Sequence, residues 1–216
     1  WVRKNEKKLF RYMTRKEVGN LFIYNKMIDR REDNLDRAKK ELRRLINANA
    51  DILTKFVTLT FGEDVQDVDE ANKRFTAFIK RLKRFDDTLQ YVTVVEFTKK
   101  GRVHYHMLCN LKYIKKAKLQ EIWGNGFVQI NRIDRVDNVG AYVVKYMQKD
   151  MHDPRLREKK AYFRSRGLKK PVEITDNKKI QRYIETLDKK GIKPIFETKF
   201  ANEQCSGLYL QYNLKR

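Results

Sequence analysis

Hydrophobic and polar positions follow two periods in the middle of the chain. Strict alternation typical of strands covers 55–61 and ends at Gly62, and three later segments are rich in β-branched and aromatic residues. Between and after them, apolar residues recur at spacings of three and four, as in amphipathic helices. The order β-α-β-β-α-β, followed by a helix, predicts an α+β fold with a ferredoxin-like antiparallel sheet and two helices on one face. The predicted strands are 55–61, 90–97, 102–109 and 127–133, and the predicted helices are 67–85, 114–123 and 139–149.

The flanking segments are less regular. Residues 17–46 favour a helix with apolar residues every seven positions, which is typical of packing on a domain and also of a weak coiled coil. After the middle segment we expect a basic loop at 155–170, a short helix at 178–187, and strands at 194–200 and 208–212. The chain is therefore expected to comprise a helical N-terminal extension (1–50), a core (51–150) and a small C-terminal extension (151–216).

Charge separates the same three segments. The 216 residues carry a formal charge of +22, of which residues 1–50 hold +8, residues 51–150 hold +5 and residues 151–216 hold +9. Such an excess favours a polyanionic partner, nucleic acid above all, held by the basic flanks. Hydrophobic residues make up 41% of the chain, which excludes a disordered basic tail, and no apolar stretch is long enough to span a membrane. The two cysteines have no metal-ligand spacing and indicate reduced thiols in a cytosolic protein.

A histidine pair is the sharpest local feature. His104 and His106 lie two apart on a predicted strand, so both imidazoles point to one face, about 6–7 Å apart. A turn near Gly101 would bring Glu96, on the preceding strand, opposite His104. Two imidazoles and one carboxylate suit Mn²⁺, or Mg²⁺ if phosphate oxygens complete the shell. The alternative is an ordinary surface-facing His-Tyr-His on an amphipathic strand.

The last predicted helix of the core combines tyrosines with lysines. Tyr142, Lys145, Tyr146 and Lys149 fall on one helical face at successive i, i+3, i+4 and i+7 positions. A phenol needs a neighbouring cation or metal to act as a nucleophile, because its ordinary pKa is near 10. The alternative is an amphipathic helix with half-buried tyrosines and solvated lysines.

Together these motifs resemble the HUH endonuclease superfamily, and most closely the rolling-circle replication initiators (Rep proteins) of phages and small plasmids. The resemblance covers about residues 55–150 and rests on three ordered motifs: residues 56–61, then Glu96 with His104-Tyr105-His106, then Tyr142-Val143-Val144-Lys145-Tyr146. The tyrosines follow the histidines, as in replication initiators, whereas conjugative relaxases have the reverse order. The family fold is the β-α-β-β-α-β arrangement, usually with an extra strand.

The resemblance implies an enzyme that nicks and rejoins single-stranded origin DNA with a divalent metal. A tyrosine would attack the scissile phosphate, become linked to the 5′ phosphate and release a 3′ hydroxyl. Metal binding falls to Glu96, His104 and His106, and Lys145 would hold the phosphate or the phenolate. Tyr142 is expected to be the first nucleophile and Tyr146 the second nucleophile or a supporting residue, although either fits a single-tyrosine pattern.

The remaining expectations concern partners. DNA contacts are assigned to five residues: Thr58, Thr60, Lys149, Arg164 and Arg166. The expected partners are single-stranded or hairpin origin DNA, a host helicase, since the sequence has no P-loop motif, and a host polymerase. The expected location is the cytoplasm of a bacterial host, with no membrane association, and a homodimer is compatible with the sequence.

Two other functions fit part of the pattern. A single-strand DNA transposase of the same superfamily shares all three motifs. A non-catalytic RRM-like module shares the βαββαβ plan, but its RNP1 pattern is missing from the third strand, where the histidines stand instead.

Overall fold

The computed structural model describes residues 34–133, 139–150, 153–160, 162–201 and 206–212. The chain divides into two compact units, residues 1–170 and residues 171–216. The division follows Lys170, whereas the sequence prediction placed its boundary after residue 150. No helix among the described residues is long and apolar enough to cross a membrane.

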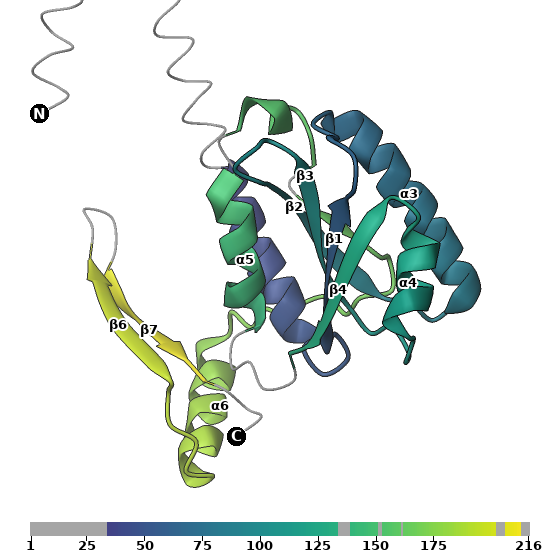
Figure 1. Cartoon of the computed structure of the whole chain (residues 1–216). Coiled ribbons are helices and arrows are strands. Elements are labelled where there is room, and N and C mark those ends of the chain that lie inside the picture. Colours follow the sequence, from purple (N-terminus) through teal and green to yellow (C-terminus); the bar gives the residue numbers. More distant parts are fainter. Residues whose placement is uncertain (1–33, 134–138, 151–152, 161, 202–205, 213–216) are drawn as a thin grey trace, which may run out of the picture. The chain divides into compact units, whose positions relative to one another are not determined.

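The first unit is built on a five-stranded antiparallel sheet, as shown in Figure 1. The spatial order is β4-β1-β3-β2-β5, so the first four strands have the ferredoxin-like order and β5 is added beside β2. The predicted α+β class is therefore confirmed. The strands are β1 (Lys55–Phe61), β2 (Tyr91–Phe97), β3 (Val103–Cys109), β4 (Gly126–Arg132) and β5 (Phe163–Arg164).

Two helices cover one face of this sheet, α3 (Val68–Phe85) and α4 (Lys116–Trp123). Helix α3 begins after Asp67, whose carboxylate accepts hydrogen bonds from the backbone N–H groups of Asp69 and Glu70. Helix α4 begins two residues later than predicted, because Ile114 is buried in extended backbone and not in the first turn of the helix.

Tyr105, the central residue of the His-Tyr-His motif, points to this helix-covered face. Its side chain is fully buried and stacks on Phe75, with 4.5 Å between ring centroids. Its hydroxyl donates a hydrogen bond to Asn72 Oδ1 at 2.7 Å. Burial raises the pKa of Tyr105, so the phenol stays protonated and serves as a core residue.

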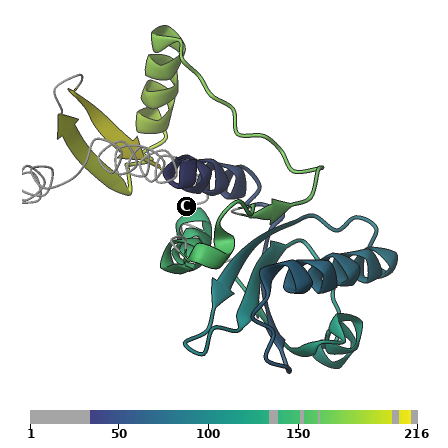
Figure 2. The same cartoon turned by 90° about the horizontal axis from the view of Figure 1, so that it is seen from above.

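The opposite face is covered by the helix at residues 34–48 and by α5 (Val139–Asp150), so the sheet lies between two helical layers (Figures 1 and 2). The two helices approach closely at Gly140, where a Cβ atom would lie 2.6 Å from Asn47 Oδ1 and 2.7 Å from the Arg43 carbonyl oxygen. Gly140 also donates its backbone N–H to Asn47 Oδ1. Glycine therefore sets the position of α5 against the sheet.

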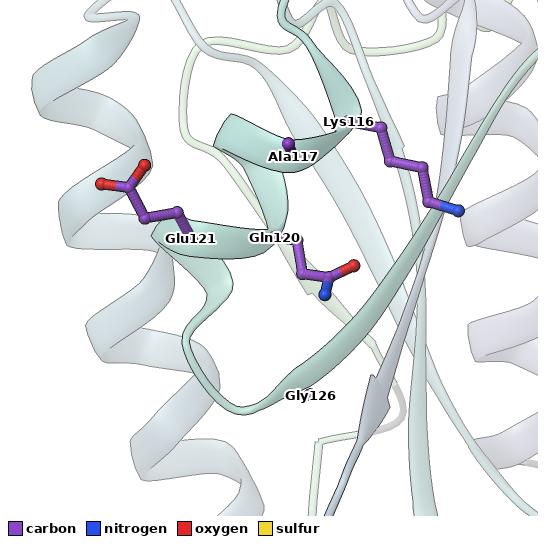
Figure 3. A pocket seen from close by; sticks show the side chains of 5 residues that line it. All are labelled: Lys116, Ala117, Gln120, Glu121 and Gly126. Carbon is purple, nitrogen blue, oxygen red and sulfur yellow. The ribbon is translucent and has the colours of Figure 1, made fainter.

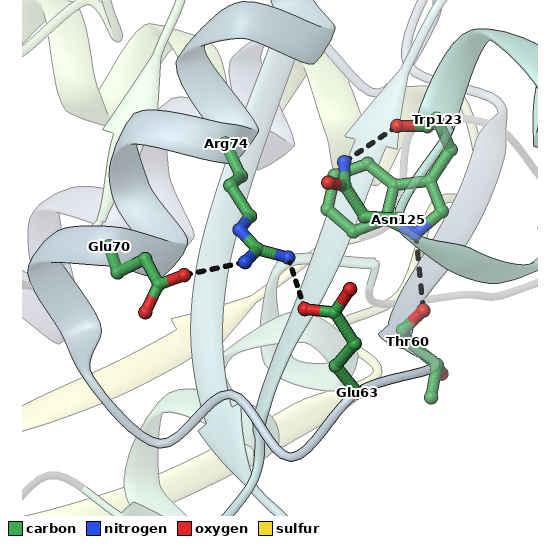
Figure 4. Close-up of polar contacts among 6 residues, drawn as sticks. All are labelled: Thr60, Glu63, Glu70, Arg74, Trp123 and Asn125. Carbon is green, nitrogen blue, oxygen red and sulfur yellow. Dashed lines mark hydrogen bonds and ion pairs between the residues drawn. The ribbon is translucent and has the colours of Figure 1, made fainter.

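The start of β4 is held against the end of β1, as Figure 4 shows. The buried indole of Trp123 donates a hydrogen bond to the Thr60 carbonyl at 3.1 Å, and Asn125 Nδ2 donates to the Trp123 carbonyl. Gly126, at φ +145°, passes so close to β1 that a Cβ atom would lie 2.3 Å from the backbone nitrogen of Gly62. Nearby, Arg74 bridges Glu63 and Glu70.

The segment at 155–170, expected to be a basic loop, contains β5 and part of a 3-10 turn, η2 (Pro154–Leu156). Alternation does not reveal a two-residue strand, and β5 forms because Tyr91–Phe97 offers it an edge. The helix expected at 17–46 is present from residue 34 to residue 48, and its earlier part lies outside the described residues.

The second unit is small. It contains helix α6 (Asn177–Lys189) and an antiparallel hairpin of β6 (Phe196–Ala201) and β7 (Ser206–Gln211). These elements agree with the helix and two strands predicted from the sequence, with shifts of one to two residues at most ends. Within its described part only Leu187 is a buried hydrophobic residue, so this unit has little core of its own.

Candidate active site

The β2–β3 hairpin presents Glu96 and both histidines on one face. Glu96 is the direct Cα partner of His104, and His106 lies two residues further along β3. Partners in an antiparallel pair point to the same side, and so do residues two apart on a strand. The pairing expected from the turn at Gly101 is therefore present.

His106 is the most constrained member of this group. Its side chain is buried, its Nε2 contacts Glu96 Oε2, and its Nδ1 lies 3.2 Å from the Thr58 hydroxyl oxygen. In a neutral imidazole this arrangement has Nε2–H donating to the carboxylate and Nδ1 accepting from the hydroxyl. Thr58 thereby orients the ring, and the pairing of Thr58 with His106 in the sheet register makes this contact.

Two tyrosines of α5 lie directly over this histidine. The phenolic oxygens of Tyr142 and Tyr146 are 3.0 Å apart, and the Tyr146 ring centroid is 4.0 Å from that of His106. Both tyrosine side chains are half-buried. The motif residues of β2, β3 and α5 therefore converge on one point of the sheet.

Phe56 joins these groups, and sequence reasoning did not single it out for the site. Its ring stacks on His106 at 5.5 Å and 13°, and it contacts Tyr142 and Tyr146 at centroid distances of 5.3 and 5.4 Å. The alternation of β1 places Phe56 on the same face as Thr58, which was the available signal.

Burial changes the acidity of one phenol. Burial, followed by the hydrogen bond with Tyr142, raises the pKa of Tyr146 to about 12. At neutral pH Tyr146 therefore keeps its proton. Acting as a nucleophile here requires compensating positive charge, and the site's own donors offer a place for it.

The donor set fits a divalent cation in chemistry and in strand position. Two imidazoles and a carboxylate from adjacent strands are ligands suited to Mn²⁺ and related ions. As the side chains stand, Glu96 and His106 contact each other, and among the described residues no three His, Cys, Asp or Glu side chains gather closely enough to hold a metal. Binding an ion here would therefore require side-chain rotation, while the backbone already places Glu96, His104 and His106 on one face.

The other predicted residues differ in their placement. Thr60 is the Cα partner of His104 and lies on the site face. Lys145 is exposed on α5, one turn from Tyr142. Arg164 and Arg166 are exposed, and Arg164 pairs with Val92, toward the far end of β2 from Glu96. The side chain of Lys149 lies outside the described residues.

A shallow pocket lies elsewhere, between α4 and the start of β4 (Figure 3). It is lined by Lys116, Ala117, Gln120, Glu121 and Gly126, and contains none of the predicted site residues. The candidate site is a packed cluster on a sheet face and not a cavity of this kind.

The fold and the convergent histidine, glutamate and tyrosine side chains are consistent with the class of rolling-circle replication initiators. Residues 54–151 match a family model of replication-associated proteins, those of the ORF2 type. This segment runs from the residue before β1 to the residue after α5 and contains the whole site. The match confirms the resemblance and supports a role in replication initiation. No curated protein and no solved structure matches the chain.

Proposed function

We propose that this protein initiates rolling-circle replication by nicking and rejoining single-stranded origin DNA through a 5′-phosphotyrosine. The observation that carries the proposal is the convergence of two adjacent phenols with the Glu96–His106 pair, since Tyr146 packs on the imidazole. The family match supports the replication role, and the site chemistry supports the covalent mechanism.

The reaction is a displacement at phosphorus. A tyrosine loses its phenolic proton, its oxygen bonds to the scissile phosphorus, and the bond from phosphorus to the 3′ oxygen breaks as that oxygen takes up a proton. The 5′ phosphate stays on the protein and the 3′ hydroxyl primes synthesis. The reverse step, with a 3′ hydroxyl attacking the phosphotyrosine, rejoins a strand without a nucleotide cofactor.

Tyr142 is the proposed first nucleophile. Its hydroxyl shares a hydrogen bond with that of Tyr146, so Tyr146 can donate to the Tyr142 oxygen and keep the attacking atom aligned. After the first cleavage the same pair offers a second phenol within one helical turn for a second cleavage. Lys145, exposed beside them, is proposed to bind the phosphate.

Mn²⁺ or Mg²⁺ is proposed to be held by Glu96, His104 and His106. A divalent ion at these residues would supply positive charge that polarises the phosphate and lowers the pKa of a phenol. The chain's own contribution is to orient the ligands, because Thr58 holds the Nδ1 side of His106 and Phe56 supports the ring.

The proposed substrate is single-stranded or hairpin origin DNA, which the charge of +22 favours. Unwinding and synthesis are assigned to a host helicase and polymerase in the cytoplasm of a bacterial host. Thr58 and Thr60 face the substrate side of the sheet, and Arg164, Arg166 and Lys149 are proposed phosphate contacts.

The test is formation of a covalent adduct. The protein is incubated with Mn²⁺ and a pool of 3′-labelled single-stranded oligonucleotides with random cores, and then denatured in SDS. Because the 5′ phosphate of the downstream fragment stays attached, the label should migrate with the protein. An adduct that persists in the variant carrying both Tyr142→Phe and Tyr146→Phe would overturn the mechanism, as would no adduct with the wild type on a pool containing its origin.

A further inference from the structure

An exposed row of side chains on the edge strand β4 continues the candidate active site across the sheet. Phe127 is the Cα partner of Thr60, Thr60 is the partner of His104, and His104 is the partner of Glu96. Because antiparallel partners share a face, Phe127 lies on the same face as the predicted metal ligands. Two strand spacings separate it from His104, about 10 Å.

Two amides extend this row along β4. Gln129 is the partner of Thr58, and Asn131 is the partner of Phe56. Phe127, Gln129 and Asn131 are all exposed, Phe127 to 63%, whereas Val128 between them is buried on the other face. Helix α5 contacts β2 and β3, and the exposure of the three side chains shows that no described helix covers this row.

We propose that Phe127, Gln129 and Asn131 form a base-reading strip for the single-stranded DNA next to the scissile phosphate. This rests on the proposed nicking function, whose site supplies one end of the strip. An exposed phenylalanine alone needs no explanation, but a ring followed by two amides in register with the site matches the chemistry of base recognition. Aromatic rings stack on bases of any sequence, and amides hydrogen-bond to the edges of unpaired bases.

The start of the strip is rigid. Gly126 approaches β1 too closely for any side chain, and the indole of Trp123 donates to the Thr60 carbonyl beside Phe127 (Figure 4). The Asn125 carbonyl also accepts the backbone N–H of Gly62 at 2.8 Å. A stacking ring on such a fixed strand loses little conformational freedom on binding. The strip has no formal charge, so its expected contribution is base contact, with phosphate contacts left to the basic residues.

The test separates binding from cleavage. Affinity for a labelled single-stranded oligothymidylate is measured by fluorescence anisotropy in EDTA, for the wild type, Phe127→Ala and Phe127→Trp. We expect Phe127→Ala to weaken the Kd by about five- to one-hundredfold and Phe127→Trp to restore it. Tyr113→Ala, which removes an exposed aromatic ring outside the sheet, is the matched control and should leave the Kd unchanged.

The amides are tested by selection from a random single-stranded pool. The variant with Gln129→Ala and Asn131→Ala should bind sequences that have lost base preference at one or two positions. An unchanged Kd for Phe127→Ala overturns the proposal, and so does a change of oligomeric state without a change in DNA affinity, which would mark a protein contact. If Phe127→Ala weakens binding while no protein forms the adduct, the strip stands and the nicking function falls. If the adduct forms and Phe127→Ala binds normally, the reverse holds.

Discussion

The phenolic oxygens of Tyr142 and Tyr146 lie 3.0 Å apart, within hydrogen-bonding distance of each other. One turn of α5 separates the two residues, so the pair is set by the helix and its packing on Phe56. Because the oxygens share one hydrogen bond, removing either hydroxyl changes the environment of the other. The two tyrosines are therefore best tested singly and together.

Tyr142→Phe should abolish adduct formation with the origin oligonucleotide, because it removes the proposed first nucleophile. Tyr146→Phe should retain a single cleavage and lose the transfer of a second strand, since the second phenol is missing. The two reactions are measured separately, as the 3′-labelled adduct and as joined product. Loss of adduct in Tyr146→Phe with retention in Tyr142→Phe would reverse the assignment.

Glu96→Gln should raise the Mn²⁺ concentration needed for half-maximal adduct formation by more than about tenfold, because it removes the anionic oxygen ligand. Chelation with EDTA should stop the reaction in the wild type, and added Mn²⁺ should restore it. Glu121→Gln, which changes an exposed carboxylate on α4, is the matched control. Equal Mn²⁺ dependence in the wild type and Glu96→Gln would argue against the ligand assignment.

Thr58→Val should lower the rate of adduct formation about 10- to 100-fold while DNA affinity changes little. The valine keeps the volume but loses the hydroxyl that lies 3.2 Å from His106 Nδ1, so the ring is no longer held in one orientation. Thr58→Ser keeps the hydroxyl and should retain most activity. A rate for Thr58→Val equal to that of the wild type would mean that Phe56 alone holds the ring.

Asn49→Ala should destabilise the first unit by about 2–3 kcal/mol. The buried amide donates to the carbonyls of Leu45 and Lys169 and accepts the backbone N–H of Lys169, all at 2.8 Å, so it ties the end of the helix at 34–48 to the chain after β5. Urea unfolding measures the loss, with the exposed Gln181→Ala as control. A loss comparable to the control would show that water replaces these bonds.

Cys109 should resist alkylation in the folded protein. Its side chain is fully buried, and burial raises the pKa of the thiol to about 11, so little reactive thiolate exists at pH 8. In a Cys205→Ser background, iodoacetamide should label the protein slowly in buffer and rapidly in guanidinium chloride. Since the pKa is higher in the folded state than in the unfolded state, the thiol contributes to a loss of stability as pH rises above about 9. Rapid labelling of the folded protein would indicate local opening of β3.

Local patterns determined much of the molecule. Alternation and helical spacing identified the four long strands and the helices between them, because each element buries one face whatever its neighbours are. The turn at Gly101 set the register of its hairpin, so Glu96 could be placed opposite His104 from the sequence. The grouping of Tyr142 and Tyr146 also followed from helical spacing alone.

The tertiary structure decided which of these faces meet. Thr58 reaches His106 only because β1 lies between β3 and β4, and Phe56 meets both tyrosines only because α5 packs over that side of the sheet. Strand β5 forms only because the edge of β2 is available to it. These contacts join residues far apart in the chain, and their geometry depends on strand order and close packing, which no local period encodes. The residue types of the site were therefore legible in the sequence, and their common hydrogen-bonded cluster was decided by the fold.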